Sequence, residues 1–110
     1  FTGEATEQDG RVVVHNDSKV ITLPDGSATP GTDVSVYVRP EDIDVSTEPT
    51  GATNEFPGTV VDVANLGNRA EMSVELADGT TALAHTGRFP DIAVGDDVCI
   101  RFDADRVIVL

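Results

Sequence analysis

Apolar and polar residues alternate along several short stretches of this chain, and the longest such stretch occurs twice. Gly31–Ser46 places an apolar residue at every second position of its strands, and Gly95–Leu110 repeats the pattern 64 residues later. The matching apolar pairs are Val34 with Val98, Val36 with Ile100, Val38 with Phe102, Ile43 with Val107 and Val45 with Val109. Alternation with a period of two is typical of a β-strand with one buried face, so both stretches predict half-buried strands.

A tight acidic corner follows the first strand of each copy. The first corner is Arg39–Asp42 and the second is Asp103–Arg106. The ring of Pro40 fixes φ near the value that the first turn of a helix needs, so the chain can change direction there at little cost. We interpret the two copies as a duplicated β unit, with chance similarity between strands rich in Val, Asp and Gly as the alternative.

Weaker echoes extend the duplication toward the N-terminus. Phe1–Gly3 resembles Phe56–Gly58 at an offset of 55 residues, and Ile21–Gly26 resembles Val74–Gly79 at an offset of 53. Because the offset grows to 64 in the long repeat, this alignment puts the extra residues of the second copy around Thr80–Asp91.

Further strands are predicted in both halves of the chain. They are Phe1–Thr6, Arg11–His15, Val20–Leu23, Thr59–Leu66, Ala70–Leu76 and Thr81–His85. Apolar residues nowhere recur with the spacing of an amphipathic helix, and ten glycines and six prolines interrupt the chain. The prediction is an all-β fold of small OB-like barrels built from two related β units. Residues 1–46 form the first unit, 47–55 a linker rich in Pro, Gly and Thr, and 56–110 the second unit.

The composition adds charge as its main feature. With 20 acidic residues against 7 basic ones, the chain has a formal net charge of −13, and Lys19 is its single lysine. A surface of this sign disfavours nucleic acid and anionic membranes as partners, because both require basic residues to neutralise phosphates. Acidic surfaces with few lysines resemble those of proteins from extremely salty cytoplasm, so we expect a halophilic source.

The residue types that perform catalysis or bind metals do not form a recognisable pattern. The sequence lacks a phosphate-binding loop and a nucleophile elbow, and His15 and His85 stand apart from other metal ligands. The single cysteine, Cys99, is interpreted as a small strand residue rather than a nucleophile. Carboxylate pairs such as Glu41 with Asp42 could bind a hard cation, although weak cation screening explains them better. We therefore expect no catalytic residue, no metal site and no enzyme activity in this chain.

An ordered set of motifs covers nearly the whole chain. These are Val38–Ile43 (VRPEDI), Asn54-x-Phe56-x-Gly58-x-Val60, Leu66-Gly67, Leu76-x-Asp78-Gly79, Gly95-Asp96-x-Val98 and the closing stretch Phe102–Leu110. The set resembles the TOBE region, the C-terminal regulatory segment of the ATPase subunits of ABC importers for sugars, polyamines, ferric iron and oxyanions such as molybdate or tungstate. The first residue is not Met, which agrees with a piece excised from a longer protein.

The resemblance implies a non-catalytic regulatory and dimerisation domain. In the family, OB-like barrels follow the nucleotide-binding domain, pair with the same region of a second ATPase subunit, and in some members receive a regulatory protein or the transported solute. ATP and Mg would bind outside these residues. The parent protein would lie in the cytoplasm at the inner face of the membrane, attached to a permease. The corner formed by Arg39, Pro40, Glu41 and Asp42 would be structural or lie at an interface.

The alternative is a free-standing module that binds an oxyanion of the molybdate or tungstate type. Oxyanion-binding relatives carry a Ser/Thr-Ala-Arg-Asn stretch before the first barrel strand and a Lys-x-Ser region later. Here Ala52-Thr53-Asn54 keeps a small residue and the Asn but lacks the Arg, and no Lys follows. Within an acidic surface, a doubly charged anion would need the hydrogen-bond donors of Thr53, Asn54, Arg69 and Arg88 to converge. A plain linker is the simpler interpretation of this stretch.

Overall fold

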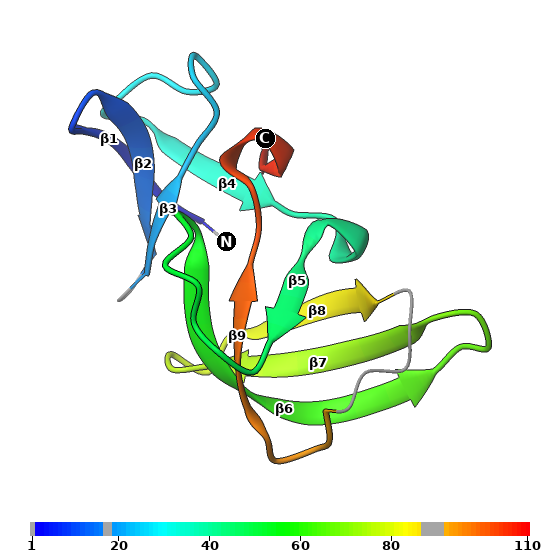
Figure 1. Ribbon diagram of the computed structural model, residues 1–110. Coiled ribbons are helices and arrows are strands. Elements are labelled where there is room, and N and C mark those ends of the chain that lie inside the picture. The colour runs from blue at the N-terminus through cyan, green and yellow to red at the C-terminus, as the bar shows by residue number, and fades with distance from the viewer. Residues whose placement is uncertain (1, 17–18, 87–91) are drawn as a thin grey trace.

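The fold is a pair of antiparallel β-sheets with five strands each (Figure 1). The computed structural model describes residues 2–16, 19–86 and 92–110. The first sheet contains β1 (Thr2–Gln8), β2 (Arg11–Asn16), β3 (Lys19–Thr22), β4 (Asp33–Tyr37) and β10 (Ile108–Val109). The second contains β5 (Asp44–Ser46), β6 (Glu55–Asn65), β7 (Ala70–Leu76), β8 (Thr81–Thr86) and β9 (Asp97–Arg101). Two 3₁₀ helices, η1 (Pro40–Asp42) and η2 (Ala104–Arg106), precede β5 and β10. The predicted all-β, OB-like class is confirmed.

The two sheets share one topology, and each takes an outer strand from the other half of the chain. The order is β10-β4-β1-β2-β3 in the first sheet and β5-β9-β6-β7-β8 in the second. Strands β1 to β4 therefore correspond to β6 to β9, and β5 corresponds to β10. Residues 1–46 supply β5 to the second sheet, while residues 56–110 supply β10 to the first. The predicted pair of related β units is confirmed, with their last strands exchanged.

Equivalent glycines mark the same point in the two sheets. Gly3 lies opposite Val34 and Gly58 lies opposite Val98, so the two valines occupy equivalent buried positions, as the repeat predicts. A Cβ atom would lie 2.1 Å from a backbone carbonyl oxygen of β2 in the first case and 2.8 Å from one of β7 in the second. Only glycine lets the central strand approach its neighbour this closely at both sites.

The sequence similarity between Ile21–Gly26 and Val74–Gly79 does not align equivalent strands of the two units, so this part of the predicted repeat is wrong. The first segment begins in β3, whose counterpart is β8, whereas the second begins in β7, whose counterpart is β2. The two segments share an Asp-Gly turn after apolar residues, and such turns follow many strands. Part of the extra length lies instead in the hairpin after β6, where Leu66–Arg69 replaces the short turn Asp9-Gly10.

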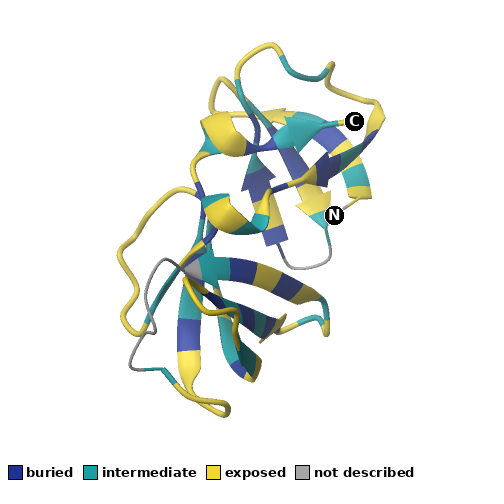
Figure 2. Cartoon of the chain, turned by 90° about the vertical axis from the view of Figure 1, so that its right-hand side faces the viewer, coloured by how far each residue is buried: buried dark blue, intermediate teal, exposed yellow. Residues whose placement is uncertain are grey.

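Valine, isoleucine, leucine and alanine dominate the core, and buried and exposed residues alternate along the strands (Figure 2). The largest fully buried side chains are Ile21, Leu23, Met72, Ile100, Val14, Val60, Val74 and Asn54. The molecule is elongated, with extents of 42 × 24 × 21 Å. In the described part of the chain, no helix has the length and apolar character needed to cross a lipid bilayer.

Two polar contacts join the sheets across their boundary. The ammonium group of Lys19 on β3 donates to the carboxylate of Asp78 in the turn between β7 and β8, and these side chains are only 5% and 8% exposed. The side chain of Asn54, just before β6, pairs with the backbone of Thr22 on β3. Both contacts involve β3. They fix the edge of the first sheet against the residue before β6 and the turn after β7 in the second sheet.

Candidate functional site

Three of the four residues expected to converge on an anion can be placed, and they lie at the two ends of β6. Thr53 and Asn54 lie in the loop just before this strand, whereas Arg69 lies in the hairpin beyond its far end. The strand has 11 residues, and a chain of that length extends over about 30 Å. Arg88 lies outside the described residues. Thr53 and Asn54 are therefore neighbours, and Arg69 is at the opposite end of the strand.

Asn54 is completely buried and substitutes for a strand neighbour of β3. Its Oδ1 accepts the backbone N–H of Thr22 at 2.8 Å, and its Nδ2 donates to the Thr22 carbonyl oxygen at 3.0 Å. Its own carbonyl oxygen accepts the N–H of Phe102 at 3.1 Å. Buried backbone groups at a sheet edge need such partners, so the amide of Asn54 serves the fold.

Thr53 lies in a small hollow together with two arginines that the sequence analysis did not connect with it. Arg11 at the start of β2 and Arg101 at the end of β9 line this hollow, whose volume is about 230 Å³. The other lining residues are Asp44, Ala52, Phe102, Asp103 and Ala104. We call it the arginine hollow. Both sheets and the loop before β6 contribute to it, so it is formed where the two halves of the chain pack together.

Each guanidinium group of the arginine hollow is oriented by neighbouring oxygens. Arg11 Nε lies 3.1 Å from the carboxylate of Asp25, and its Nη2 donates to a backbone carbonyl oxygen at 3.0 Å. Arg101 Nη1 donates to Ser46 Oγ at 3.0 Å, and its Nε lies 4.0 Å from Asp44. The two arginine side chains are 43% and 31% exposed, which leaves part of each planar donor fork open to solvent. Two aspartates offset the charge of the two arginines in this lining. The hollow therefore offers a ligand directed hydrogen-bond donors rather than a net positive charge.

The loop before β6 folds around a carboxylate of the chain itself. Glu55 accepts the N–H groups of Thr50 and Gly51 and the Thr50 hydroxyl, at distances from 2.6 to 3.0 Å. The Thr50 hydroxyl, followed by its N–H, holds the pKa of Glu55 below the ordinary value. Residues 47–55, which the sequence suggests are a plain linker, therefore adopt a defined conformation. This conformation places Thr53 at the arginine hollow.

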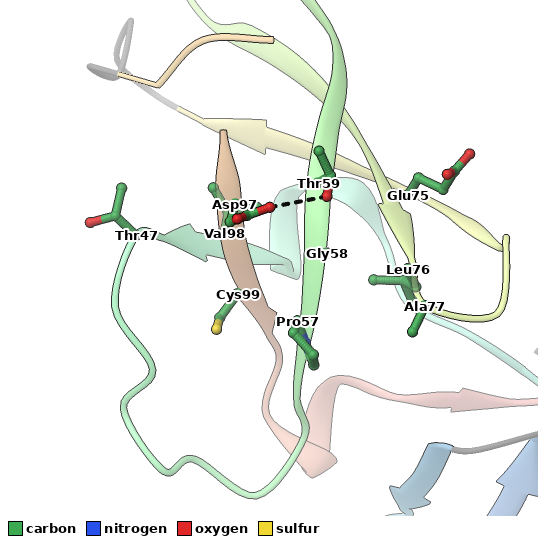
Figure 3. A pocket seen from close by; sticks show the side chains of 10 residues that line it. All are labelled: Thr47, Pro57, Gly58, Thr59, Glu75, Leu76, Ala77, Asp97, Val98 and Cys99. Carbon is green, nitrogen blue, oxygen red and sulfur yellow. Dashed lines mark hydrogen bonds between the residues drawn. The ribbon is translucent and has the colours of Figure 1, made fainter. Parts of the chain in front are cut away.

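A larger groove crosses the outer face of the second sheet (Figure 3). It has a volume of about 560 Å³ and is lined by Thr47, Pro57, Gly58, Thr59, Glu75, Leu76, Ala77, Asp97, Val98 and Cys99. Thr59 lies opposite both Glu75 and Asp97 in the strand register, and its hydroxyl is 3.3 Å from Asp97 Oδ1. This pair of carboxylates has the wrong sign for an oxyanion.

Cys99 in this outer groove is a free, half-buried thiol. Burial, and then the charges of two nearby glutamates, raise the pKa of the Cys99 thiol above its ordinary value. A thiol reacts as a nucleophile through its thiolate, so a raised pKa makes Cys99 a weaker nucleophile than an ordinary cysteine near neutral pH. The groove therefore offers two carboxylates and a hydroxyl beside this thiol.

The corner Arg39–Asp42 forms η1. The N–H of Asp42 donates to the carbonyl oxygen of Arg39 at 2.9 Å, and Pro40 occupies the start of the helix, where its fixed φ is favourable. The helix packs against β8, while the side chains of Arg39 and Glu41 are exposed. The turn thus contacts the second sheet through β8 and presents two charged side chains to solvent.

His85 on β8 pairs with a carboxylate on the neighbouring strand. Its Nε2 lies 2.8 Å from Glu71 Oε2, and the two residues are directly opposite in the register. Within residues 2–16, 19–86 and 92–110, no three His, Cys, Asp or Glu side chains are grouped as a metal site would require.

Fold and hollow together define a small all-β module with a small polar depression where two strand-exchanged sheets meet. The TOBE domain profile matches residues 36–110, and the chain belongs to this family. Among solved structures, the chain is similar to the cytoplasmic molybdate-binding protein ModG, crystallised with molybdate bound. The TM-score is 0.74 at 19% sequence identity, and the match covers 99% of this chain and 92% of that one. At this identity the likeness concerns the fold.

Proposed function

We propose that this chain is a non-catalytic regulatory and dimerisation region of an ABC importer ATPase subunit. The observation that carries the proposal is membership of the TOBE domain family over residues 36–110, a range that includes the exposed corner Arg39–Asp42. The partners of this region would be its own nucleotide-binding domain and a second ATPase subunit, and through them a membrane permease. ATP and Mg would be bound by the nucleotide-binding domain, and the complex would act at the cytoplasmic face of the membrane.

The strand exchange suits a regulatory region, in which binding of a partner at one sheet affects the position of the other sheet. Each sheet takes its outer strand from the other half of the chain. A displacement of one sheet is therefore coupled to the other sheet through the exchanged strands and their backbone pairing. Charged side chains at the corner η1 suit an interface whose pairing depends on complementary charge.

The proposal is tested first by the coding sequence upstream of Phe1, which should encode a nucleotide-binding domain. In that full-length protein, reversing two charges with Glu41→Arg and Asp42→Arg should weaken ATP-dependent subunit association, measured by analytical ultracentrifugation. Glu7→Arg, an exposed charge reversal on β1, is the matched control and should leave association unchanged. An upstream sequence that encodes no nucleotide-binding domain would contradict the proposal.

The arginine hollow favours a second candidate function, a module that binds a small oxyanion of the molybdate or tungstate type. Thr53 belongs to the stretch Ala52-Thr53-Asn54, which resembles the anion-binding stretch of oxyanion-binding relatives but lacks its Arg, and two arginines line the same hollow. Guanidinium forks and a hydroxyl are suitable donors for a tetrahedral oxyanion. The fold likeness to a molybdate-binding protein is consistent with this candidate.

Calorimetry with molybdate, tungstate and sulfate tests the second candidate. Saturable binding at micromolar concentration should weaken about tenfold or more in Arg101→Ala and Arg11→Ala, because each change removes charge-assisted hydrogen bonds. Arg69→Ala removes the same side chain at the far end of β6 and should have no effect. Absence of binding by all three anions would leave the regulatory proposal alone.

A further inference from the structure

The duplicated topology gives the arginine hollow a counterpart at the other corner of the molecule. The residues 64 positions before Arg101, Phe102 and Ala104 are Tyr37, Val38 and Pro40, and these three line a second hollow beside η1. Its volume is about 340 Å³. The complete lining is Asn16, Val36, Tyr37, Val38, Pro40, Ile43, Thr80, Thr81, Ala82 and Leu83. We call it the Tyr37 hollow.

Among the described residues, none that lines the Tyr37 hollow has a side chain charged at neutral pH, although 25% of the residues of the chain are charged. The arginine hollow, by contrast, contains two arginines and two aspartates. The main difference is that Tyr37 in the first unit occupies the position of Arg101 in the second, just before the corner in each case. The linings of the two hollows therefore differ in charge, although both corners contain a short 3₁₀ helix.

The Tyr37 hollow combines an apolar floor with an aromatic rim. Val36, Val38 and Ile43 are buried, whereas Tyr37 and Leu83 are 50% and 38% exposed. The hollow lies between β4 and η1 on one side and β8 on the other, so ordered elements of both sheets hold it. Its volume lies in the lower part of the range of small-molecule sites, about 300–1,000 Å³.

Neutral polar groups complete the lining. Asn16 donates one N–H to the Thr2 carbonyl oxygen at 2.7 Å, which fixes the amide and leaves its oxygen as an acceptor. Thr81 contributes a hydroxyl from the edge strand β8. An apolar pocket with a few fixed neutral donors and acceptors selects ligands by shape and hydroxyl pattern rather than by charge.

We propose that the Tyr37 hollow binds a neutral, polyhydroxylated small molecule of the size of a sugar. The ring of Tyr37 would cover an apolar face of the ligand, while Asn16 and Thr81 would bond to its hydroxyl groups. A charged ligand would lose its hydration here without gaining an opposite charge, so the site discriminates against ions. The inference concerns a different hollow from the anion proposal and holds or fails separately from it.

Tyr37 is the single tyrosine and the chain has no tryptophan, so its fluorescence reports on this hollow alone. We would titrate the full chain with D-glucose and with maltose in about 2 M KCl, which screens the surface charges. A saturable fluorescence change is expected with at least one of them. Thr81→Val should weaken it about threefold to tenfold through loss of a hydrogen bond. Leu83→Ala should weaken it severalfold through loss of apolar contact.

Matched controls distinguish this site from its counterpart. Tyr37→Ala, followed by calorimetry because it removes the fluorophore, should abolish sugar binding, whereas Arg101→Ala should not change it. Circular dichroism verifies that each variant is folded. The proposal is overturned if neither sugar gives a saturable signal, if the Thr81 and Leu83 variants bind as well as the parent, or if Arg101→Ala removes binding.

Discussion

At the scale of single residues, the polar side chains that are buried serve to hold one sheet against the other. Asn54 supplies β3 with the donor and acceptor that a neighbouring strand would otherwise provide. Lys19 and Asp78 bury opposite charges together at the same boundary. A buried polar group is costly when it loses its partner, so these residues specify how the halves fit.

Asn54→Ala should lower the free energy of unfolding by about 1–3 kcal/mol, because the N–H and carbonyl groups of Thr22 lose buried partners. Urea denaturation measures the change. Asn68→Ala, in the exposed hairpin after β6, is the matched control and should change stability by less than about 0.5 kcal/mol. Equal effects of the two substitutions would show that the Asn54 amide is not a structural link.

Asp78 should make stability depend on pH in a defined direction. Hydrogen bonds from Lys19, and then from the N–H of Thr80, hold the pKa of the Asp78 carboxyl well below its usual range. An unfolded aspartate has a pKa of about 3.9. The stabilisation is therefore fully present above about pH 5 and is lost as the pH falls through the lower value of the folded state.

Asp78→Asn should therefore lower the urea midpoint at neutral pH, and its difference from the parent chain should narrow as the pH falls from about 5 to 2.5. Asp62→Asn, an exposed substitution on β6, should track the parent at every pH. A difference that stays constant over this range would refute the assigned role of the carboxylate.

Only part of the candidate site could be predicted at the residue scale. The motif Ala52-Thr53-Asn54 lies in the loop before β6, and Thr53 lines the arginine hollow, while its contact with an anion stays a prediction. Arg11 and Arg101 could not be connected with it, because they come from different sheets and no short-range pattern records which strand ends meet. One available signal is position, since Arg101 lies two residues before the second corner, as Tyr37 lies two residues before the first.

At the scale of elements, alternation identified the strands but not their partners. The period of two shows which side chains face the core, and the predicted β7 matches the observed Ala70–Leu76. The exchange of β5 and β10 left no trace in the pattern, because an edge strand has the same alternation whichever sheet it completes. The Asp9-Gly10 sequence predicted a hairpin, and both residues have the positive φ that a two-residue hairpin turn requires.

Gly58→Ala tests the close approach of β6 to β7. The added Cβ would lie 2.6 Å from Val74 Cγ1 and 2.8 Å from the Glu75 carbonyl oxygen, so the strand must move. We expect a loss of about 1–3 kcal/mol in the free energy of unfolding, measured by urea denaturation. Thr59→Ala, one residue further along β6, should cost clearly less, because its side chain points to the partly open outer face. Equal costs would argue against steric crowding at Gly58.

At the scale of the whole molecule, the acidic charge surrounds a core that contains few aromatic residues. Aromatic residues make up only 5% of the chain, so the core gains its stability from many modest aliphatic side chains. Mutual repulsion within a net charge of −13 opposes this compact state. The screening length falls from about 10 Å at 0.1 M salt to about 3 Å at 1 M, so salt should remove much of the repulsion.

The melting temperature should therefore rise as KCl is increased from about 0.15 M to 2 M, as measured by circular dichroism. Salt can also strengthen apolar burial, and a variant with fewer charges separates the two effects. The triple change Glu7→Gln, Asp62→Asn and Asp105→Asn removes exposed charges only. If repulsion is the cause, this variant should start with a higher melting temperature in low salt and gain less from added KCl. Equal gains in the two proteins would assign the effect to apolar burial, and a flat or falling curve for the parent chain would remove the case for adaptation to high salt.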